Sequence, residues 1–172
     1  MDTIGTFINR FEDLAKAIQR KFSIPYLVTL GQAALESNWG QKAPGNNFFG
    51  IKAGSNWDGD TQVFLTTEIV TPEQFKKLKA VKSSTRLESG NYKITIYQKF
   101  RKYDTPNDSF IDYAKLLSTS DYYKKAFNYT DPSNFAREIA KNYATQPDYF
   151  QRLYNVMVLI KKKPVKVLQI AV

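Results

Sequence analysis

The sequence predicts an α+β protein, with a mostly helical body and a small β-rich lobe that forms one side of a cleft. Apolar residues recur at helical spacing over the first 38 residues and again between residues 107 and 162. The intervening segments 60–70 and 91–101 are rich in β-branched and aromatic residues and partly alternate, as strands do. The length of 172 residues suits one domain with a substantial core.

The helical body is expected to contain six helices, several of which have recognisable start signals. Pro25, Pro132 and Pro147 stand where a first helical turn tolerates proline, and Asp131 is a suitable N-cap. The helices are expected at residues 2–21, 25–38, 107–119, 120–128, 132–144 and 147–162.

The β-rich lobe, about residues 57–103, is expected to hold two strands at 60–70 and 91–101. Between the strands, 72–82 has the pattern of a short basic helix, and 83–90 that of a loop. We expect one domain over residues 1–163. The tail, residues 164–172, is expected to add a strand or to act as a linker.

The composition excludes several kinds of chemistry. The chain has no His and no Cys, which removes Ser-His and Cys-His nucleophile pairs and the usual zinc ligands. No Asp/Glu cluster has the spacing of a calcium loop, so we expect neither metal nor cofactor. No apolar run approaches the roughly 18 residues of a membrane span, so no membrane insertion is expected.

The net charge of +9 favours a polyanionic partner, because the summed charge raises its local concentration. Nucleic acid, an acidic membrane surface and an anionic cell wall all fit this charge. The basic residues are scattered and no RNA-binding signature is present, so we expect no nucleic-acid partner. The molecule is expected to be a monomer.

Glu36 is the most informative residue, because it ends a small-residue, apolar helix in the run AALESNWG. A carboxyl group held against apolar and aromatic walls has its charged form disfavoured, which raises its pKa. Such a group stays protonated near neutral pH and can donate a proton to a leaving-group oxygen, as glycosidases require. The alternative is a solvated glutamate at a helix end.

Six motifs in one order resemble glycoside hydrolase family 73, the bacterial and phage N-acetylglucosaminidases that include the glucosaminidase domain of flagellar rod-assembly proteins. The resemblance covers roughly residues 10–160. The motifs are AALESNWG, NNFFGIKAG, a Trp-x-Gly at Trp57 to Gly59, TTE at Thr66 to Glu68, KFRKYDTPNDSF and NYATQPDY. Each motif alone is weak evidence, but all six in the order that the family shows make the resemblance specific.

The resemblance implies a lysozyme-like α+β fold and hydrolysis of the β-1,4 bond between N-acetylglucosamine and N-acetylmuramic acid in peptidoglycan. By motif position, Glu36 matches the general acid and Tyr143 the active-site tyrosine. Glu68, eleven residues after Trp57, matches the second carboxylate on the β-hairpin. The substrate-binding residues implied are Asn47, Phe49, Gly50, Lys52 and Trp57.

Two departures from the family pattern concern residues near the expected site. Gln146 replaces the acid of the family's YATDP motif, a change that we expect to be tolerated. The hairpin is lengthened by residues 72–90. Within them, Glu88 stands beside a Ser-Gly pair that resembles the Asn-Gly-type turn of many relatives, so Glu88 remains the alternative to Glu68. A third route uses the substrate's own acetamido group as nucleophile, with Tyr143 orienting it.

The sequence is also compatible with two rival functions. Muramidases and lytic transglycosylases also carry a Glu-Ser pair after an apolar helix, but transglycosylases follow it with a Gly-Leu-Met-Gln-type segment where this chain has NNFFGIK. A non-catalytic cell-wall-binding module is the second rival. The chain is expected to act on the bacterial cell wall. Without a signal peptide, it suits a phage endolysin, a virion-associated lysin or a domain of a larger exported protein.

Overall fold

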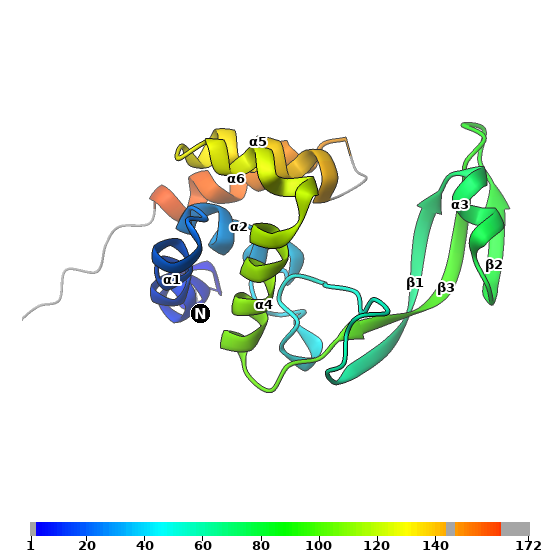
Figure 1. Cartoon of the computed structure of the whole chain (residues 1–172), viewed down its shortest axis with the longest axis horizontal. Coiled ribbons are helices and arrows are strands. Elements are labelled where there is room, and N and C mark those ends of the chain that lie inside the picture. Colours follow the sequence, from blue (N-terminus) through cyan, green and yellow to red (C-terminus); the bar gives the residue numbers. More distant parts are fainter. Residues whose placement is uncertain (1–2, 144–146, 163–172) are drawn as a thin grey trace, which may run out of the picture. The chain divides into compact units, whose positions relative to one another are not determined.

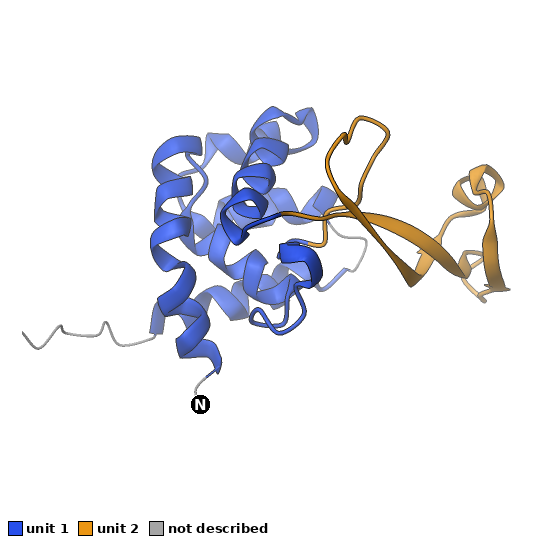
Figure 2. Ribbon diagram, turned by 90° about the horizontal axis from the view of Figure 1, so that it is seen from below, with its two compact units in different colours: residues 1–49, 104–172 blue, residues 50–103 orange. Residues whose placement is uncertain are grey.

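The computed structural model describes residues 3–143 and 147–162, and the chain divides into two compact units. The first unit comprises residues 1–49 and 104–172, and the second comprises residues 50–103, as Figure 2 shows in two colours. Helices fill the first unit and a small sheet fills the second, which confirms the expected α+β class. The predicted tail and Gln146 lie outside the described residues.

The helices of the first unit follow the expected pattern closely (Figure 1). The N-cap predicted at Asp131 is present, because its Oδ1 accepts a hydrogen bond from the Asn134 amide at 2.9 Å. The segment expected as a helix at 120–128 is a 3₁₀-helix. The elements are α1 (Thr3–Phe22), α2 (Tyr26–Glu36), η1 (Pro44–Asn46), α4 (Pro106–Thr119), η2 (Asp121–Asn128), α5 (Pro132–Tyr143) and α6 (Tyr149–Lys162).

Helix α2 packs against α1, α5 and α6 and is the most buried helix of the first unit. Gly31 allows the close approach of α6, because a Cβ there would lie 3.0 Å from Met157 Cγ. Helix α2 ends two residues earlier than predicted, since Asn38 and Trp39 adopt φ values of 48° and 57° that a helix cannot continue. Glu36 is therefore the last helical residue.

The second unit contains a three-stranded antiparallel sheet of order β1-β3-β2. Strands β1 (Thr61–Val70) and β3 (Tyr92–Arg101) pair along ten residues, so both predicted strands are confirmed within one residue. Strand β2 (Val81–Arg86) pairs with the other side of β3.

The segment between β1 and β3 differs from the prediction. Helix α3 covers only Pro72–Lys77, and the first half of the expected loop at 83–90 belongs to strand β2. The sequence VKSSTR is polar and mostly exposed, so strand β2 has no apolar alternation that would reveal it. Strand β2 is held by backbone hydrogen bonds to β3. Such bonds leave no side-chain pattern in the sequence of a polar edge strand.

Candidate active site

Glu36 is held at the point where a buried helix meets a tight turn. Ser37 stabilises this turn, because its Oγ donates to the Ala33 carbonyl at 2.5 Å and accepts from the Gly40 amide at 2.8 Å. Gly40 itself has a φ of 78°, which favours glycine. The SNWG sequence after the glutamate thus ends the helix and leaves the Glu36 side chain at the surface of the first unit.

A chain of hydrogen bonds leads from the core of the first unit to the Glu36 carboxyl group. Tyr113 Oη donates to Gln32 Oε1 at 2.5 Å, and Gln32 Nε2 donates to Tyr149 Oη at 2.9 Å. Tyr149 Oη then donates to Glu36 Oε1 at 2.8 Å. Gln32 and Tyr113 are fully buried, so this series of hydrogen bonds begins in the packed core.

The pKa of Glu36 is raised, as the sequence predicts, and the first cause is desolvation of its carboxyl group by the surrounding protein. The hydrogen bond from Tyr149 and the positive charge of Arg152 act in the opposite direction. The residue nevertheless remains exposed to solvent. Glu36 is therefore an exposed residue whose carboxyl group has its charged form disfavoured by the surrounding protein.

Tyr143 ends α5 beside this hydrogen-bonded chain. Its ring centroid lies 5.8 Å from that of Tyr149 and 6.3 Å from that of Tyr123. Its hydroxyl donates to the Phe49 carbonyl at 3.2 Å. Burial raises the pKa of Tyr143 well above its ordinary value, so the hydroxyl is neutral and can act as a hydrogen-bond donor.

Two of the predicted substrate-binding residues, Asn47 and Phe49, are buried in the first unit. The Phe49 ring stacks on Tyr113, with centroids 3.9 Å apart and planes 8° from parallel. The NNFF segment therefore supports the tyrosine cluster from the core, and the Phe49 carbonyl positions Tyr143. Gly50 begins the second unit with a φ of 60°, a conformation that a side chain would strain.

Glu68 lies on β1 in the second unit, where Lys52 holds it. Lys52 Nζ is 2.5 Å from Glu68 Oε1, and Thr66 Oγ1 lies 3.4 Å from the same oxygen. Lys52 is itself fixed to the sheet by a bridge to Phe100 on β3. Two predicted site residues are thus brought together within this unit.

Glu88, the alternative second carboxylate, lies in the exposed turn between β2 and β3. The turn is closed by a hydrogen bond from the Leu87 amide to the Asn91 carbonyl at 2.8 Å. Glu68, by contrast, lies within a paired strand opposite Ile94, which is buried. The two glutamates therefore occupy different parts of the sheet unit, and Glu68 is held more firmly.

Trp57 packs within the second unit. Its Nε1 donates to the Asp60 carbonyl at 3.0 Å, and the Arg101 guanidinium lies 4.5 Å from its ring centroid. Tyr103 meets its ring edge at 5.7 Å. A Cβ at Gly59 would lie 2.5 Å from the indole, which explains the glycine of the Trp-x-Gly motif. The structure thus gives Trp57 a packing function, and its role in substrate binding stays a prediction.

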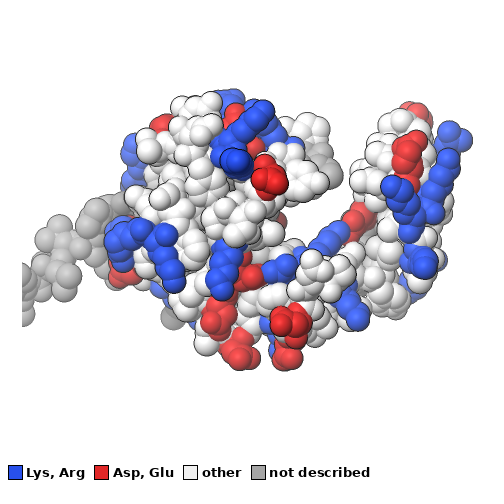
Figure 3. Space-filling model, viewed as in Figure 1, with Lys and Arg blue, Asp and Glu red and all other residues white. Residues whose placement is uncertain are grey.

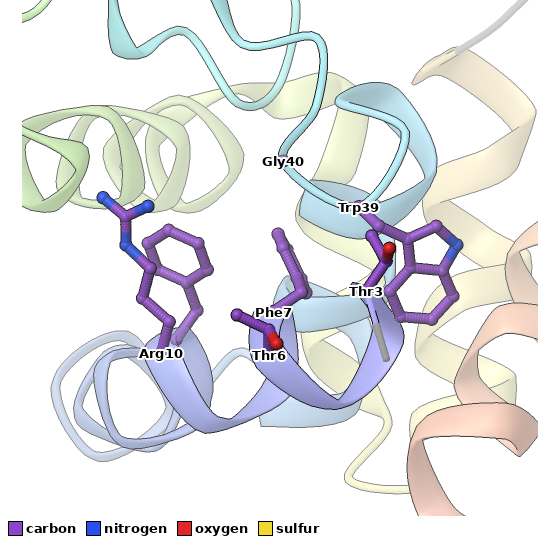
Figure 4. A pocket seen from close by; sticks show the side chains of 7 residues that line it. Thr3, Thr6, Phe7, Arg10, Trp39 and Gly40 are labelled. Carbon is purple, nitrogen blue, oxygen red and sulfur yellow. The ribbon is translucent and has the colours of Figure 1, made fainter. Parts of the chain in front are cut away.

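A separate pocket of about 240 Å³ lies between α1 and the turn after α2 (Figure 4). Phe7 and Trp39 contribute aromatic walls that meet edge to face at 5.8 Å. The pocket contains none of the predicted site residues. Its lining is Thr3, Thr6, Phe7, Arg10, Phe11, Trp39 and Gly40.

Comparison with known proteins decides the family. Residues 12–162 match the profile of the glucosaminidase family, described as mannosyl-glycoprotein endo-beta-N-acetylglucosaminidase. The chain belongs to this family. Solved structures related to it include a peptidoglycan hydrolase mutant from Sphingomonas sp. A1, with 31% identity and a TM-score of 0.70 over 88% of this chain and 91% of that chain. The lysozyme-like fold expected from the sequence is thereby confirmed.

Curated relatives of this glucosaminidase-family chain include the peptidoglycan hydrolase FlgJ of Escherichia coli K12, 30% identical over 86% of this chain and 44% of that protein. The exo-glucosaminidase LytG of Bacillus subtilis is 29% identical over 89% of this chain and 50% of that protein. A probable N-acetylmuramidase of Lactococcus lactis is 29% identical over 88% of this chain and 32% of that protein. The chain spans between about a third and a half of the length of these three relatives.

Sequence reasoning missed Gln32, Tyr113 and Tyr149 as members of the site. Tyr149 is the last letter of the NYATQPDY motif, and Gln32 precedes Glu36 by one helical turn in an otherwise apolar stretch. A glutamine at that position, one turn from the acid, was the available signal. In the described part of the chain no three His, Cys, Asp or Glu side chains form a metal-binding group. Nor is any described helix long and apolar enough to cross a membrane.

Proposed function

We propose that this glucosaminidase-family chain is a peptidoglycan endo-β-N-acetylglucosaminidase that cleaves the β-1,4 bond between N-acetylglucosamine and N-acetylmuramic acid. The observation that carries the proposal is Glu36, an exposed residue whose carboxyl group has a raised pKa and accepts a hydrogen bond from Tyr149. The relatives named as peptidoglycan hydrolases support the substrate. The chain acts on the bacterial cell wall as a monomer that needs no cofactor.

Glu36 acts as the general acid, and the hydrogen bond from Tyr149 selects the oxygen that donates. Because Oε1 accepts from Tyr149, the acidic proton resides on Oε2. That proton passes to the glycosidic oxygen as the bond between this oxygen and the anomeric carbon breaks, and the bonding electron pair stays with the oxygen. The hydrogen bond from Tyr149 and the charge of Arg152 then stabilise the carboxylate that remains.

Glu68 is the second carboxylate in this proposal. It either activates a water molecule or stabilises the positive charge that develops at the anomeric carbon. Lys52 fixes its Oε1, which leaves Oε2 for the reaction. If the substrate's acetamido group serves as the nucleophile instead, Tyr143 is the neutral donor that would orient it.

The test is mass spectrometry of purified peptidoglycan after digestion and borohydride reduction. Reduced N-acetylglucosamine at the new ends of multi-sugar fragments supports the proposal. Reduced N-acetylmuramic acid would identify a muramidase, the activity in the name of the Lactococcus lactis relative. Anhydro ends would identify a lytic transglycosylase. Release of single sugars would indicate exo cleavage, as in the name of LytG.

A further inference from the structure

One face of the β1–β3 hairpin exposes large apolar side chains to solvent. The exposed fractions are 52% for Val63, 46% for Leu65, 56% for Ile69 and 61% for Tyr97. Along β1, exposed residues at odd positions alternate with half-buried residues at most even positions. Successive side chains of a strand point to opposite faces, so the odd positions of β1 share one face. We call it the outer face.

The register places basic residues on the same outer face. Leu65 pairs with Tyr97, while Val63 pairs with Lys99 and Ile69 pairs with Lys93. Directly paired residues of antiparallel strands point to the same side, so both lysines accompany the apolar side chains.

Strand β2 brings a third lysine to the exposed tyrosine of the outer face. Lys82 Nζ lies 5.7 Å from the centroid of the Tyr97 ring. Basic side chains along the sheet unit appear blue in Figure 3.

The outer face carries no acidic side chain at the odd positions of β1 and β3. The acidic residue of these two strands, Glu68, occupies an even position of β1 and therefore points to the reverse face. The outer face thus presents apolar side chains among uncompensated positive charges. A partner that matches it must be anionic and must also offer an apolar environment.

Among anionic partners, an anionic lipid surface matches both properties. Glycans and polyol-phosphate polymers supply negative charge or ring faces, but they give Val, Leu and Ile nothing apolar to contact. A bilayer surface supplies anionic headgroups for lysines and an acyl boundary for aliphatic side chains, and tyrosine is enriched at that boundary. Contiguous apolar patches are uncommon on soluble monomers and mark interaction surfaces.

We propose that the outer face docks the protein on an anionic phospholipid membrane. Val63, Leu65, Ile69 and Tyr97 enter the boundary between headgroups and acyl chains. Lys82, Lys93 and Lys99 lie among the anionic headgroups. Because Glu68 and its Lys52 partner face the other side of the sheet, docking leaves them accessible. The inference stands independently of the proposed enzymatic function.

The experiment is co-sedimentation of the full chain with phosphatidylcholine vesicles that contain or lack phosphatidylglycerol. We expect binding only to the anionic vesicles. A Lys93→Gln/Lys99→Gln variant should bind about 25-fold more weakly, since each lysine near an anionic membrane contributes about fivefold. A Leu65→Ser/Ile69→Ser variant should lose about tenfold or more through its smaller apolar area.

Matched variants on the first unit distinguish the outer face from general charge and hydrophobicity. Lys124→Gln/Lys125→Gln removes the same charge from exposed positions, and Leu159→Ser removes a similarly exposed leucine. Both controls should bind as the wild type does. An equal loss in the controls would overturn the proposal, as would the absence of wild-type binding to anionic vesicles.

Two further measurements guard against misleading results. Tyr97→Trp preserves an aromatic residue, and its fluorescence should shift to the blue on anionic vesicles and be quenched by lipids brominated in the acyl chains. An unchanged spectrum in a folded variant would overturn the proposal. Sedimentation with lipid-free cell walls should fall no further for the outer-face variants than for the matched first-unit variants, of which the lysine pair loses the same charge. A matching loss there would show that the face binds a wall polymer.

Discussion

Tyr149→Phe is the sharpest test of the site, because it removes a single hydroxyl group and keeps the ring. Two hydrogen bonds are lost together. Glu36 Oε1 loses its donor, and Gln32 Nε2 loses its acceptor. The stacking of this ring beside Tyr143 is retained. The variant therefore isolates the contribution of the hydrogen-bonded chain from that of packing.

The expected change in the pKa of Glu36 follows from the charge of its acceptor oxygen. A hydrogen bond to a charged group contributes about 1.5–3 kcal/mol, against about 1 kcal/mol for a neutral one. The bond thus favours the ionised carboxyl by about 1 kcal/mol and holds the pKa of Glu36 down. Without it, the pKa of Glu36, already raised by desolvation, rises further. The protonated acid then persists to higher pH.

Two kinetic effects and one stability effect should therefore appear. The alkaline limb of the pH profile of kcat/KM should move to higher pH, because the pKa of Glu36 rises when the hydrogen bond is lost. The maximal kcat should fall by about fivefold, because the carboxylate left after proton transfer loses about 1 kcal/mol of stabilisation. The free energy of unfolding should fall by about 1–3 kcal/mol, because the buried Gln32 amide keeps no acceptor.

The assay is the pH dependence of kcat and KM on a defined peptidoglycan fragment, together with thermal unfolding. Tyr154→Phe is the matched control, because this tyrosine lies on the same helix and its side chain is exposed. It should leave both profiles unchanged. If the alkaline limb of the kcat/KM profile stays in place or moves to lower pH in Tyr149→Phe, the role given to this hydrogen bond is refuted.

The remaining predictions concern the two carboxylates, metal dependence and salt. Glu36→Gln should reduce turnover by about 10²–10⁴-fold with unchanged circular dichroism, and near-normal turnover would remove it from the mechanism. Glu68→Gln should cost more activity than Glu88→Gln; the reverse order would assign the role to Glu88, and two silent variants would favour the acetamido route. EDTA should not lower activity, a result contradicted if one added divalent ion restores a loss. Added salt should weaken lysis of walls more than cleavage of short neutral oligosaccharides, because screening acts on the long-range attraction of the +9 chain; equal effects would discard this account.

The sequence predicted those elements whose side chains carry a periodic signal. The helical apolar stripes and the Asp131 N-cap placed five α-helices to within two residues at each end. The alternating β-branched residues placed β1 and β3. Strand β2 escaped because its polar residues are ordered by the backbone of β3, a contact between segments that no local pattern encodes.

The candidate site shows the same division between local and long-range information. Glu36 could be chosen from its local context, a carboxyl at the end of an apolar helix followed by a turn. Its partner Tyr149 lies 113 residues away in sequence, and the link from Gln32 spans 117. Likewise, nothing local distinguished a buried Phe49 from one that lines a surface. Such contacts are fixed by the packing of α2 against α6, which the tertiary fold determines.

Opposed influences on Glu36 suit a group that must both release and regain a proton. Desolvation raises its pKa, and its place at the carboxyl-terminal end of α2 also disfavours negative charge through the helix dipole. Tyr149 and Arg152 favour the ionised form and so limit this rise. A general acid works best when its pKa lies near the working pH, because each protonation state is then accessible in turn. The hydrogen-bonded chain from Gln32 thus prevents burial alone from making Glu36 too weak an acid to donate its proton.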